Sequence, residues 1–390
     1  MIWEIAFWVS FLAILHSYVL YPLIINLLAR FHKDNTEVLD PSDNLPFVSI
    51  IMAVHNEEIV ISEKLRSIFH TSYPEERIEL LVGSDGSTDK TNEKLHILAN
   101  ESEALRFFPF EERQGKPAVI NRLRNEASGE ILILTDANVM FTRDTIFEMV
   151  KHFLNPEIGL VGANISNEKT DRSGISYQEW SFISREIRMK YHEGKIWGTM
   201  IGAFGGCYAL RNEYYSHVPA GFAVDDFYIT MKVVERKKRC ILEMKAVCVE
   251  DVQNQLSEEF RRKIRISSGN FQNLRTFCKV LWPPFTGLSF SFLSHKVLRW
   301  LGPFFLLLLL LASFMLSRSS QFYSILLWIQ GILLVIPFLD LLLRKIGIHI
   351  VFLRFITYFY SMNLALLAGF FKFITRRETN VWKPTKRAAN

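Results

Sequence analysis

Apolar positions crowd the two ends of the chain, whereas polar and charged positions fill its middle. Residues 5–29 lack charged side chains over a length that can span a bilayer. Towards the other end, segments 297–317, 322–343 and 351–374 are each long enough to do the same. The pattern predicts a soluble domain held between N- and C-terminal transmembrane helices.

Within the middle part, short aliphatic runs alternate with segments of helical periodicity. Strands are expected at 48–54, 78–82, 105–108 and 131–134, and helices at 57–70, 89–99 and 116–126. From residue 159 the pattern loosens, with strand-like pieces at 160–163 and 205–210, an amphipathic stretch at 176–191 and a helix-like piece at 229–235. Strands that alternate with helices predict an α/β domain with a mainly parallel sheet, which commonly binds a nucleotide.

One strand ends in a pair of residues suited to bind a ligand. The sequence ILILTDANVM at residues 131–140 places four aliphatic residues before Thr135 and Asp136. In open α/β sheets, ligands bind at the carboxyl edge of the strands. The oxygens of Asp136 and Asn138 suit Mg²⁺ or Mn²⁺, and substrate phosphates would complete the metal shell.

Other polar loops follow the predicted strands or precede helices. They read AVHNEE at 53–58, GSDGSTD at 83–89, GKP at 115–117, AVDDF at 223–227 and FRRKIR at 260–265. Singly, each has an ordinary structural interpretation as a helix cap, a turn or a solvated charged face. Their succession after buried strands favours a binding site, in which a carboxylate of the DD pair can act as a general base and the cations can neutralise a diphosphate.

The predicted segments divide the chain in a definite order. We expect a transmembrane helix within 1–33, a linker at 34–46, a cytosolic domain at 47–280, an interfacial segment at 281–296, the three C-terminal membrane segments and a basic tail at 375–390. A cleavable signal peptide is disfavoured because the first apolar stretch is too long, lacks a basic n-region and has no small-residue cleavage site. Arg30, His32 and Lys33 follow it, so the positive-inside rule places the domain in the cytosol, in a multi-pass protein of the cell (inner) membrane.

The basic tail conflicts with this topology. Three further crossings put the C-terminus outside, yet Arg376 and Arg377 prefer the inside. Either the last segment is re-entrant or interfacial, or the charge bias is overruled.

Composition narrows the possible functions. The net charge of +5 lies mostly beside apolar segments, and no dense basic stripe with stacking aromatics indicates a nucleic-acid partner. The 4 cysteines form no CxxC pair, so a zinc site is not expected and the thiols are expected to be reduced.

In their order along the chain, the motifs AVHNEE, SDGSTD, GKPAVIN, TDAN, GGCYALR, VDDF and FRRKIR resemble those of membrane-bound family-2 glycosyltransferases, the cellulose synthase and hyaluronan synthase group. The resemblance covers roughly residues 46–275. It implies a GT-A fold (that of nucleotide-diphospho-sugar transferases), an inverting hexosyltransferase-type activity in glycan or cell-envelope biosynthesis, a UDP- or GDP-sugar donor, a glycan or lipid-linked acceptor, and Mg²⁺ or Mn²⁺ as cofactor.

The resemblance also assigns roles to residues. Those implied to bind the nucleotide sugar are Val54, Asn56, Glu57, Asp85, Lys116, Asp136, Asn138, Arg262 and Arg265. Asp136 and Asn138 would bind the metal, while Gly205, Gly206 and Cys207 would face the acceptor. In the pair Asp225 and Asp226, the second aspartate would be the base.

Two positions depart from the family pattern. Asn138 replaces the second aspartate of DxD, and the QxxRW motif of processive enzymes lacks its glutamine and tryptophan. The altered QxxRW motif and the small number of helices favour single sugar addition over processive synthesis. A non-catalytic membrane scaffold with a degenerate nucleotide fold is the alternative from another functional class.

Overall fold

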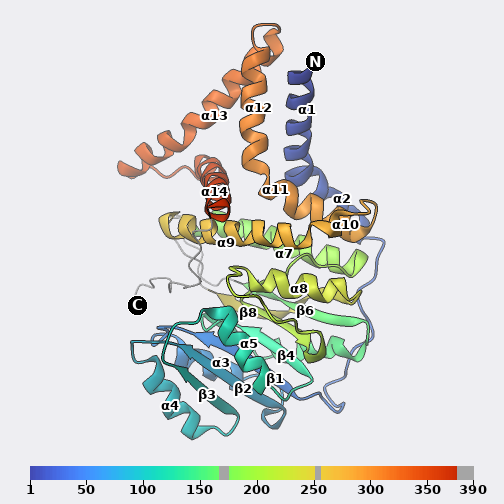
Figure 1. The fold of residues 1–390 in the computed structure, drawn as a ribbon, viewed down its shortest axis with the longest axis vertical. Coiled ribbons are helices and arrows are strands. Elements are labelled where there is room, and N and C mark those ends of the chain that lie inside the picture. Colours follow the sequence, from blue (N-terminus) through green and yellow to red (C-terminus); the bar gives the residue numbers. More distant parts are fainter. Residues whose placement is uncertain (167–174, 251–255, 376–390) are drawn as a thin grey trace. The chain divides into compact units, whose positions relative to one another are not determined.

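The computed structural model describes residues 1–166, 175–250 and 256–375, and the chain divides into two compact units (Figure 1). The first unit comprises Met1–Leu27, Thr170–Arg185 and Val252–Arg377. The second comprises Leu28–Lys169, Glu186–Asp251 and Glu378–Asn390. The second unit holds the sheet predicted from the middle of the sequence.

That sheet has eight strands in the order β3-β2-β1-β4-β7-β6-β8-β5. Their bounds are β1 Val48–Val54, β2 Ile78–Asp85, β3 Leu105–Phe110, β4 Ile131–Thr135, β5 Val139–Phe141, β6 Ile158–Ser166, β7 Cys207–Arg211 and β8 Arg239–Glu250. The strands β3, β2, β1 and β4 are mutually parallel, with Val48 in register with both Ile78 and Ile131. Every residue of β1, β2 and β4 is buried, as their continuous aliphatic runs predict.

The other half of the sheet is mixed. Strand β7 is antiparallel to β4 and to β6, and β5 is antiparallel to β8, whereas β6 and β8 are parallel. The mainly parallel α/β sheet is therefore confirmed. Strands β5 and β8 were not expected from the sequence. Strand β7 begins at Cys207 rather than at the expected residue 205.

The helices of the second unit connect these strands. They are α3 Ile61–Phe69, α4 Thr91–Glu101, α5 Lys116–Glu126, α6 Thr145–Val150 and α8 Asp225–Glu235, with short 3₁₀ turns η2 Glu75–Arg77, η3 Lys151–Leu154 and η4 Asn212–Tyr214. Helix α3 begins four residues later than the predicted start at 57, so the polar loop after β1 is longer than expected. Helix α8 begins at Asp225 rather than at 229, so both aspartates lie in its first turn.

The first unit is helical. Its elements are α1 Ile2–Leu15, η1 His16–Leu20, α9 Leu256–Phe277, η5 Cys278–Leu281, α10 Gly287–Ser291, η6 Phe292–Val297, α11 Leu298–Trp300, α12 Gly302–Leu316, α13 Gln321–Lys345 and α14 Val351–Ile374. Helices α2 Tyr21–Ala29 and α7 Ser176–Trp197 each continue from this unit into the second. Phe7 of α1 packs against Ala312 and Leu316 of α12.

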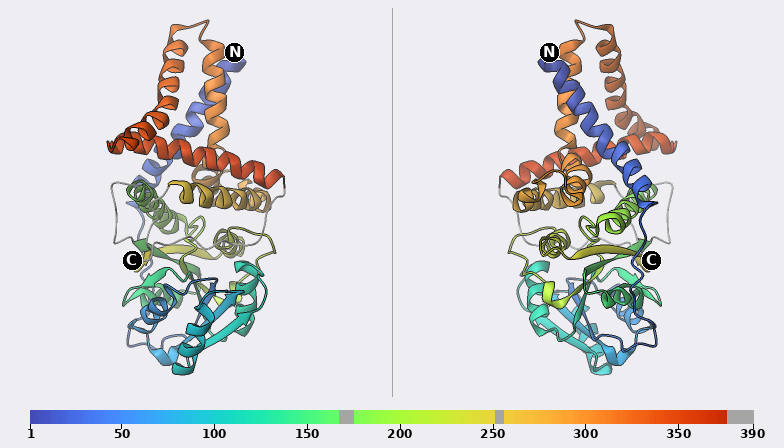
Figure 2. Two further views of the ribbon diagram at one scale, coloured as in Figure 1. Left: turned by 90° about the vertical axis from the view of Figure 1, so that its left-hand side faces the viewer. Right: turned by 90° about the vertical axis from the view of Figure 1, so that its right-hand side faces the viewer.

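Among the residues that the structure describes, three helical segments are long and apolar enough to cross a membrane: Ile2–Ala29, Gln321–Lys345 and Val351–Ile374. A fourth candidate is the pair Gly287–Trp300 and Gly302–Leu316, which is bent by 64°. Helices α1 and α12 run roughly along one direction, α13 is inclined to them, and α14 runs across them (Figure 1, Figure 2). The domain limits and membrane topology drawn from the sequence stay predictions.

Candidate active site

Two polar loops meet where β1 and β2 end. The backbone of Asn56 has φ 54°, a left-handed conformation that asparagine tolerates. The Asn56 side-chain oxygen accepts from the Thr88 backbone amide at 2.8 Å, and the Asn56 backbone amide donates to the Ser87 hydroxyl at 3.1 Å. Asn56 therefore does not cap the next helix; it joins the first predicted loop to the second.

The second loop is fastened to the third through Asp85. The carboxylate of this buried residue accepts from the Gln114 amide at 2.6 Å and from the Gly115 amide at 3.0 Å. Gly115 has φ 88°, which favours glycine, and α5 begins at the next residue. Asp85 thus positions Lys116, in addition to the nucleoside contact that the sequence predicts for it.

Lys116 lies among carboxylates. Its Nζ is 2.6 Å from Asp136 Oδ1 and 4.0 Å from Asp225 Oδ2. Burial alone lowers the pKa of Lys116, but the charges of Asp136 and Asp225 raise it above its ordinary value, so the ammonium stays protonated. Three residues that are distant in sequence therefore meet at the carboxyl edge of the sheet.

Asp226, at the start of α8, has a raised pKa. Burial and the neighbouring Asp225 charge raise its pKa to about 6. Its Oδ1 accepts from the Phe227 amide at 2.7 Å. A Cβ at Gly205 would lie 2.6 Å from Asp226 Oδ2, so the absence of a side chain at 205 makes room for this carboxylate.

The loop that carries Asp136 is held from two sides. The Gly206 carbonyl accepts from the Asp136 amide and from the Thr135 hydroxyl, both at 3.0 Å. Beneath the loop, the fully buried Lys64 donates to the Thr135 hydroxyl at 2.9 Å and to the Val139 carbonyl. The glycine motif and Lys64 therefore fix the loop that presents Asp136.

Asn138 is also held by a partner. Its amide nitrogen donates to Glu250 Oε1 at 2.9 Å, across the pair of strands β5 and β8. The bond uses the nitrogen and leaves the amide oxygen of Asn138 as an acceptor. Glu250 thus brings a further carboxylate beside the position that departs from DxD.

The oxygen atoms of Asp136 and Asn138 are suitable ligands for a divalent cation that also binds the substrate. Within residues 1–166, 175–250 and 256–375, no three His, Cys, Asp or Glu side chains form a metal cage. Asp136 offers a carboxylate and Asn138 an amide oxygen, the hard ligands that Mg²⁺ and Mn²⁺ accept. The carboxylates of Asp136, Asp225 and Asp226 lie together here, so a divalent cation would help to hold an anionic sugar nucleotide beside them.

Four residues of this region were not singled out from the sequence: Lys64, Lys190, Tyr208 and Glu250. Lys190 donates to the Ala203 carbonyl at 3.3 Å and lowers the pKa of Asp226 by its charge. The buried Tyr208 hydroxyl has no hydrogen-bond partner in the described part of the chain. Of these four residues, only Lys64 could have been noticed in the sequence, because it is a lysine at an apolar position of a predicted helix. The places of the other three in the site depend on the tertiary fold.

The remaining predicted residues lie as follows. Val54 and Glu57 are buried beside the first loop, and the Glu57 amide donates to the Thr91 hydroxyl at 2.8 Å. The Cys207 side chain is buried, with its sulfur 3.9 Å from that of Met149, so only its backbone is left to face an acceptor.

The two arginines belong to α9 of the first unit. Arg262 is 2.9 Å from both Glu179 and Glu259, which are almost fully buried, and Arg265 lies one turn further along the helix. Arg262 is thus engaged by carboxylates of its own unit. Its predicted contact with a diphosphate, and that of Arg265, stay predictions.

Comparison with known proteins bears on the family and the fold. The family model described as glycosyl transferase family 2 matches residues 49–218. A beta-monoglucosyldiacylglycerol synthase from Nostoc sp. is 32% identical over 120 residues, which are 30% of this chain and 26% of that protein. A poly-beta-1,6-N-acetyl-D-glucosamine synthase from Staphylococcus epidermidis is 23% identical over 239 residues, 60% of this chain and 57% of that protein. The matches thus span from about a quarter to just over half of these relatives.

One solved structure matches nearly the whole chain. It is a mannosyltransferase from Pyrobaculum calidifontis in complex with GDP-Man and Mn²⁺, with a TM-score of 0.73 and 22% identity, covering 96% of this chain and 100% of that one. At this identity the likeness establishes the fold, which is the GT-A fold expected from the motifs. Residues 49–218 therefore match the glycosyl transferase family 2 model, and the chain has the GT-A fold.

Proposed function

We propose that this protein is a membrane-associated inverting glycosyltransferase that moves a sugar from a nucleotide-sugar donor to a hydroxyl acceptor. The observation that carries the proposal is the meeting of Lys116, Asp136 and Asp225 within 4.0 Å at the carboxyl edge of the sheet, next to Asp226. A UDP- or GDP-sugar is the donor class and a lipid-linked or growing glycan the acceptor class, since the two curated relatives are named as a glycolipid synthase and a polysaccharide synthase.

The proposed reaction is a single displacement. The acceptor oxygen bonds to the anomeric carbon while the bond from that carbon to the diphosphate oxygen breaks, and the electron pair leaves with the nucleoside diphosphate. Asp226 takes the acceptor proton. A base with a pKa of about 6 is mostly ionised at neutral pH and still able to accept a proton, which suits this step.

The remaining groups hold the donor. Lys116 stays charged and is placed to neutralise the departing diphosphate. Asp136 and Asn138 would hold Mg²⁺ or Mn²⁺ together with the donor phosphates, and the metal would supply charge stabilisation. The contacts of Asn56 and Asp85 with neighbouring loops support their proposed role in binding the nucleoside.

The test is release of nucleoside diphosphate by the purified full-length protein, measured against a panel of nucleotide sugars with Mg²⁺ and with Mn²⁺. We expect one donor class to be turned over, and Asp226→Asn to slow transfer by roughly 10²- to 10⁴-fold with donor binding kept. A scaffold protein would release no nucleoside diphosphate from any donor. Transfer by Asp226→Asn at the wild-type rate would show that another residue is the base.

Gel sizing of the product separates single addition from polymer synthesis. We propose single addition because the glutamine and tryptophan of the processive motif are missing from residues 260–266. A ladder or a long polymer would favour a processive synthase instead.

A further inference from the structure

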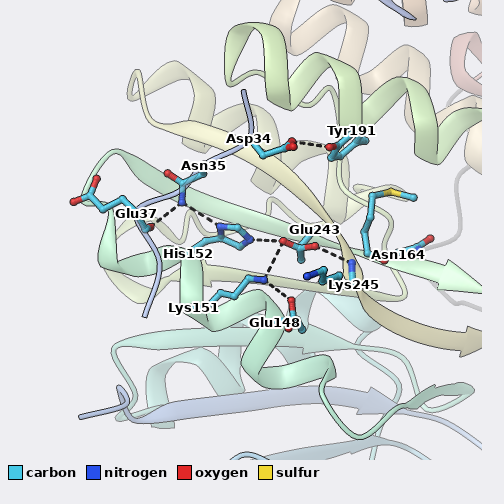
Figure 3. Close-up of polar contacts among 11 residues, drawn as sticks. Asp34, Asn35, Glu37, Glu148, Lys151, His152, Asn164, Tyr191, Glu243 and Lys245 are labelled. Carbon is cyan, nitrogen blue, oxygen red and sulfur yellow. Dashed lines mark hydrogen bonds and ion pairs between the residues drawn. The ribbon is translucent and has the colours of Figure 1, made fainter. Parts of the chain in front are cut away.

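A cavity of about 340 Å³ lies beside β8 in the second unit, and none of its lining residues belongs to the candidate active site. Its walls are the linker around Asp34, the η3 turn at Lys151 and His152, and the end of α7 at Tyr191 and Lys195 (Figure 3). On β8, the cavity is lined by Arg239 and by every residue from Ile241 to Lys245, where the pairing with β6 is irregular.

The acidic side chains of the cavity already have partners. Asp34 accepts from the Tyr191 hydroxyl at 2.6 Å and lies 3.2 Å from Lys195 Nζ. Glu243 lies 2.6 Å from His152 Nε2 and 3.4 Å from Lys151 Nζ.

Those partners stabilise the ionised form of Glu243. Burial alone would raise its pKa, but the hydrogen bond from His152, that from the Lys245 amide and the charge of Lys151 lower it to about 2. Glu243 is therefore ionised and compensated by its neighbours, and Asp34 is engaged by Tyr191 and Lys195, so neither carboxylate is free to bind a cationic ligand.

Two cations of the cavity are uncommitted. Neither the Arg239 guanidinium nor the Lys245 ammonium has a hydrogen bond or ion pair to any residue that the structure describes. In total the walls carry four lysines and arginines against two carboxylates, with Asp34 and Glu243 as the only acids among the lining residues. The excess of two positive charges is thus presented by side chains that still have all their donors to offer.

The chemistry of the lining residues indicates what kind of ligand the cavity would bind. Arginine offers a planar fork of donors that matches a phosphate, and lysine adds a point charge. Val38, Ile241, Leu242 and Met244 provide apolar contacts along the same walls. The cavity therefore matches a small organic molecule that carries a phosphate group.

The linker that walls the cavity comes directly from the first apolar helix. Asp34 follows the helix end at Ala29 by five residues, which bounds their separation at about 18 Å. Both a soluble organic phosphate and a phospholipid head group are therefore compatible sources of such a ligand.

We propose that this cavity is a second binding site of the protein, which takes a phosphate monoester or diester through Arg239 and Lys245. The site is independent of sugar transfer.

The test measures binding of two probes to the full-length protein. Glycerol 3-phosphate is titrated calorimetrically into protein in non-ionic detergent, and thermal unfolding is compared in the same detergent with and without phosphatidylglycerol, so that the reference sample contains no phosphodiester. We expect at least one probe to bind, and Arg239→Gln with Lys245→Gln to weaken binding about tenfold or more. Binding of glycerol 3-phosphate indicates a soluble ligand, whereas stabilisation by phosphatidylglycerol alone indicates a lipid.

Three controls define the site. Arg66→Gln removes an exposed arginine of α3 outside the cavity and should leave probe binding unchanged. Lys116→Gln should also leave it unchanged, which separates this site from the diphosphate site. Arg239→Lys keeps the charge without the fork and should bind with intermediate affinity, even if the double variant folds poorly. If neither probe binds, or if Arg239→Lys and the double variant bind like wild type, the proposal is wrong.

Discussion

Lys64 is a fully buried lysine of α3 that lies beneath the loop that presents Asp136. It donates to the Thr135 hydroxyl and the Val139 carbonyl, and its ammonium lies 3.7 Å from the centroid of the Phe141 ring. Burial lowers its pKa to about 8, against the opposing charges around it. Since Thr135 and Val139 bracket Asp136 and Asn138, we infer that Lys64 positions the two proposed metal ligands.

The first prediction concerns Lys64→Met, which keeps the length of the side chain but removes its donors. The Val139 carbonyl is left unsatisfied, at a cost of about 1–3 kcal/mol in the free energy of unfolding. We expect the half-saturating concentration of Mn²⁺ to rise roughly 10- to 100-fold. Leu65→Met on the same helix is the control, and a metal response like that of wild type would contradict the inference.

Asp226 supplies the second prediction, through its raised pKa. The carboxyl titrates near pH 4 in the unfolded chain and near 6 in the folded one. Between these values the folded state binds more protons, so the contribution of Asp226 to stability falls as the pH rises from about 4 to about 6. Above pH 6, kcat/KM should be independent of this group, and below it should fall with a slope of one.

The pH profile of kcat/KM and the unfolding temperature across that range check both statements. Asp226→Asn should remove the acid limb from the residual activity and flatten this part of the stability profile. An acid limb that persists unchanged in Asp226→Asn would assign the pKa to another group.

At the scale of elements, the approach of β7 to α8 controls where the base lies. Gly205 precedes β7, and a methyl group there would meet Asp226 Oδ2 at 2.6 Å. We expect Gly205→Ala to displace the carboxylate and to lower kcat roughly 100-fold, as misplacement by about 1 Å commonly does. Circular dichroism and steady-state kinetics together distinguish misplacement from unfolding.

The matched control for Gly205→Ala is Gly331→Ala in α13, where no atom lies within 4 Å of the new methyl group. That variant should retain wild-type kcat. Equal kinetics in both variants would contradict the steric argument.

The bridge between β5 and β8 explains how asparagine replaces the second acid of DxD. Asn138→Asp would turn the 2.9 Å hydrogen bond to Glu250 into a contact between two carboxylates, which raises the pKa of one of them. We therefore expect Asn138→Asp alone to weaken metal-dependent activity, and addition of Glu250→Gln to restore it. A double-mutant cycle on the Mn²⁺ response measures this coupling; additive effects would show that the two residues act independently.

At the scale of the whole molecule, the direction of α14 bears on the conflict over the tail. Within the first unit, α14 runs across α1, α12 and α13 and packs along α9, where Ser267 donates to the Leu366 carbonyl at 2.8 Å (Figure 2). An α14 that lies at the interface leaves three crossings. The basic tail then falls on the same side as the sheet domain, as the positive-inside rule favours.

The fifth prediction tests that topology. The exposed Cys278 is replaced by serine, and a single cysteine is then introduced at Asn390 or, as the reference for the sheet domain, at Arg66. An impermeant maleimide should label both variants in inside-out vesicles and neither in intact spheroplasts. Labelling of the two cysteines from opposite sides would mean that α14 crosses the membrane.

Much of the fold was determined by the sequence itself. The aliphatic runs fix β1 and β4 because a strand buried on both faces needs continuous apolar side chains, and Gly115 marks the start of α5 because its backbone requires a positive φ. The loops carrying Asn56, Asp85, Lys116 and Asp136 were identified because each follows a buried strand or opens a helix. The GT-A fold, and the match of residues 49–218 to the glycosyl transferase family 2 model, agree with the same motifs.

Only the tertiary structure decided which of these groups meet. The antiparallel return of β7 brings Gly205 to Asp226, and β8, whose alternation is weak in sequence, brings Glu250 to Asn138 and opens the cavity at Arg239. In the sequence, Lys64 is only a polar position on an apolar helix face. The structure shows that the Thr135 hydroxyl and the Val139 carbonyl accept hydrogen bonds from it. These pairs are separated by tens of residues and depend on strand order and register, which local periodicity does not encode.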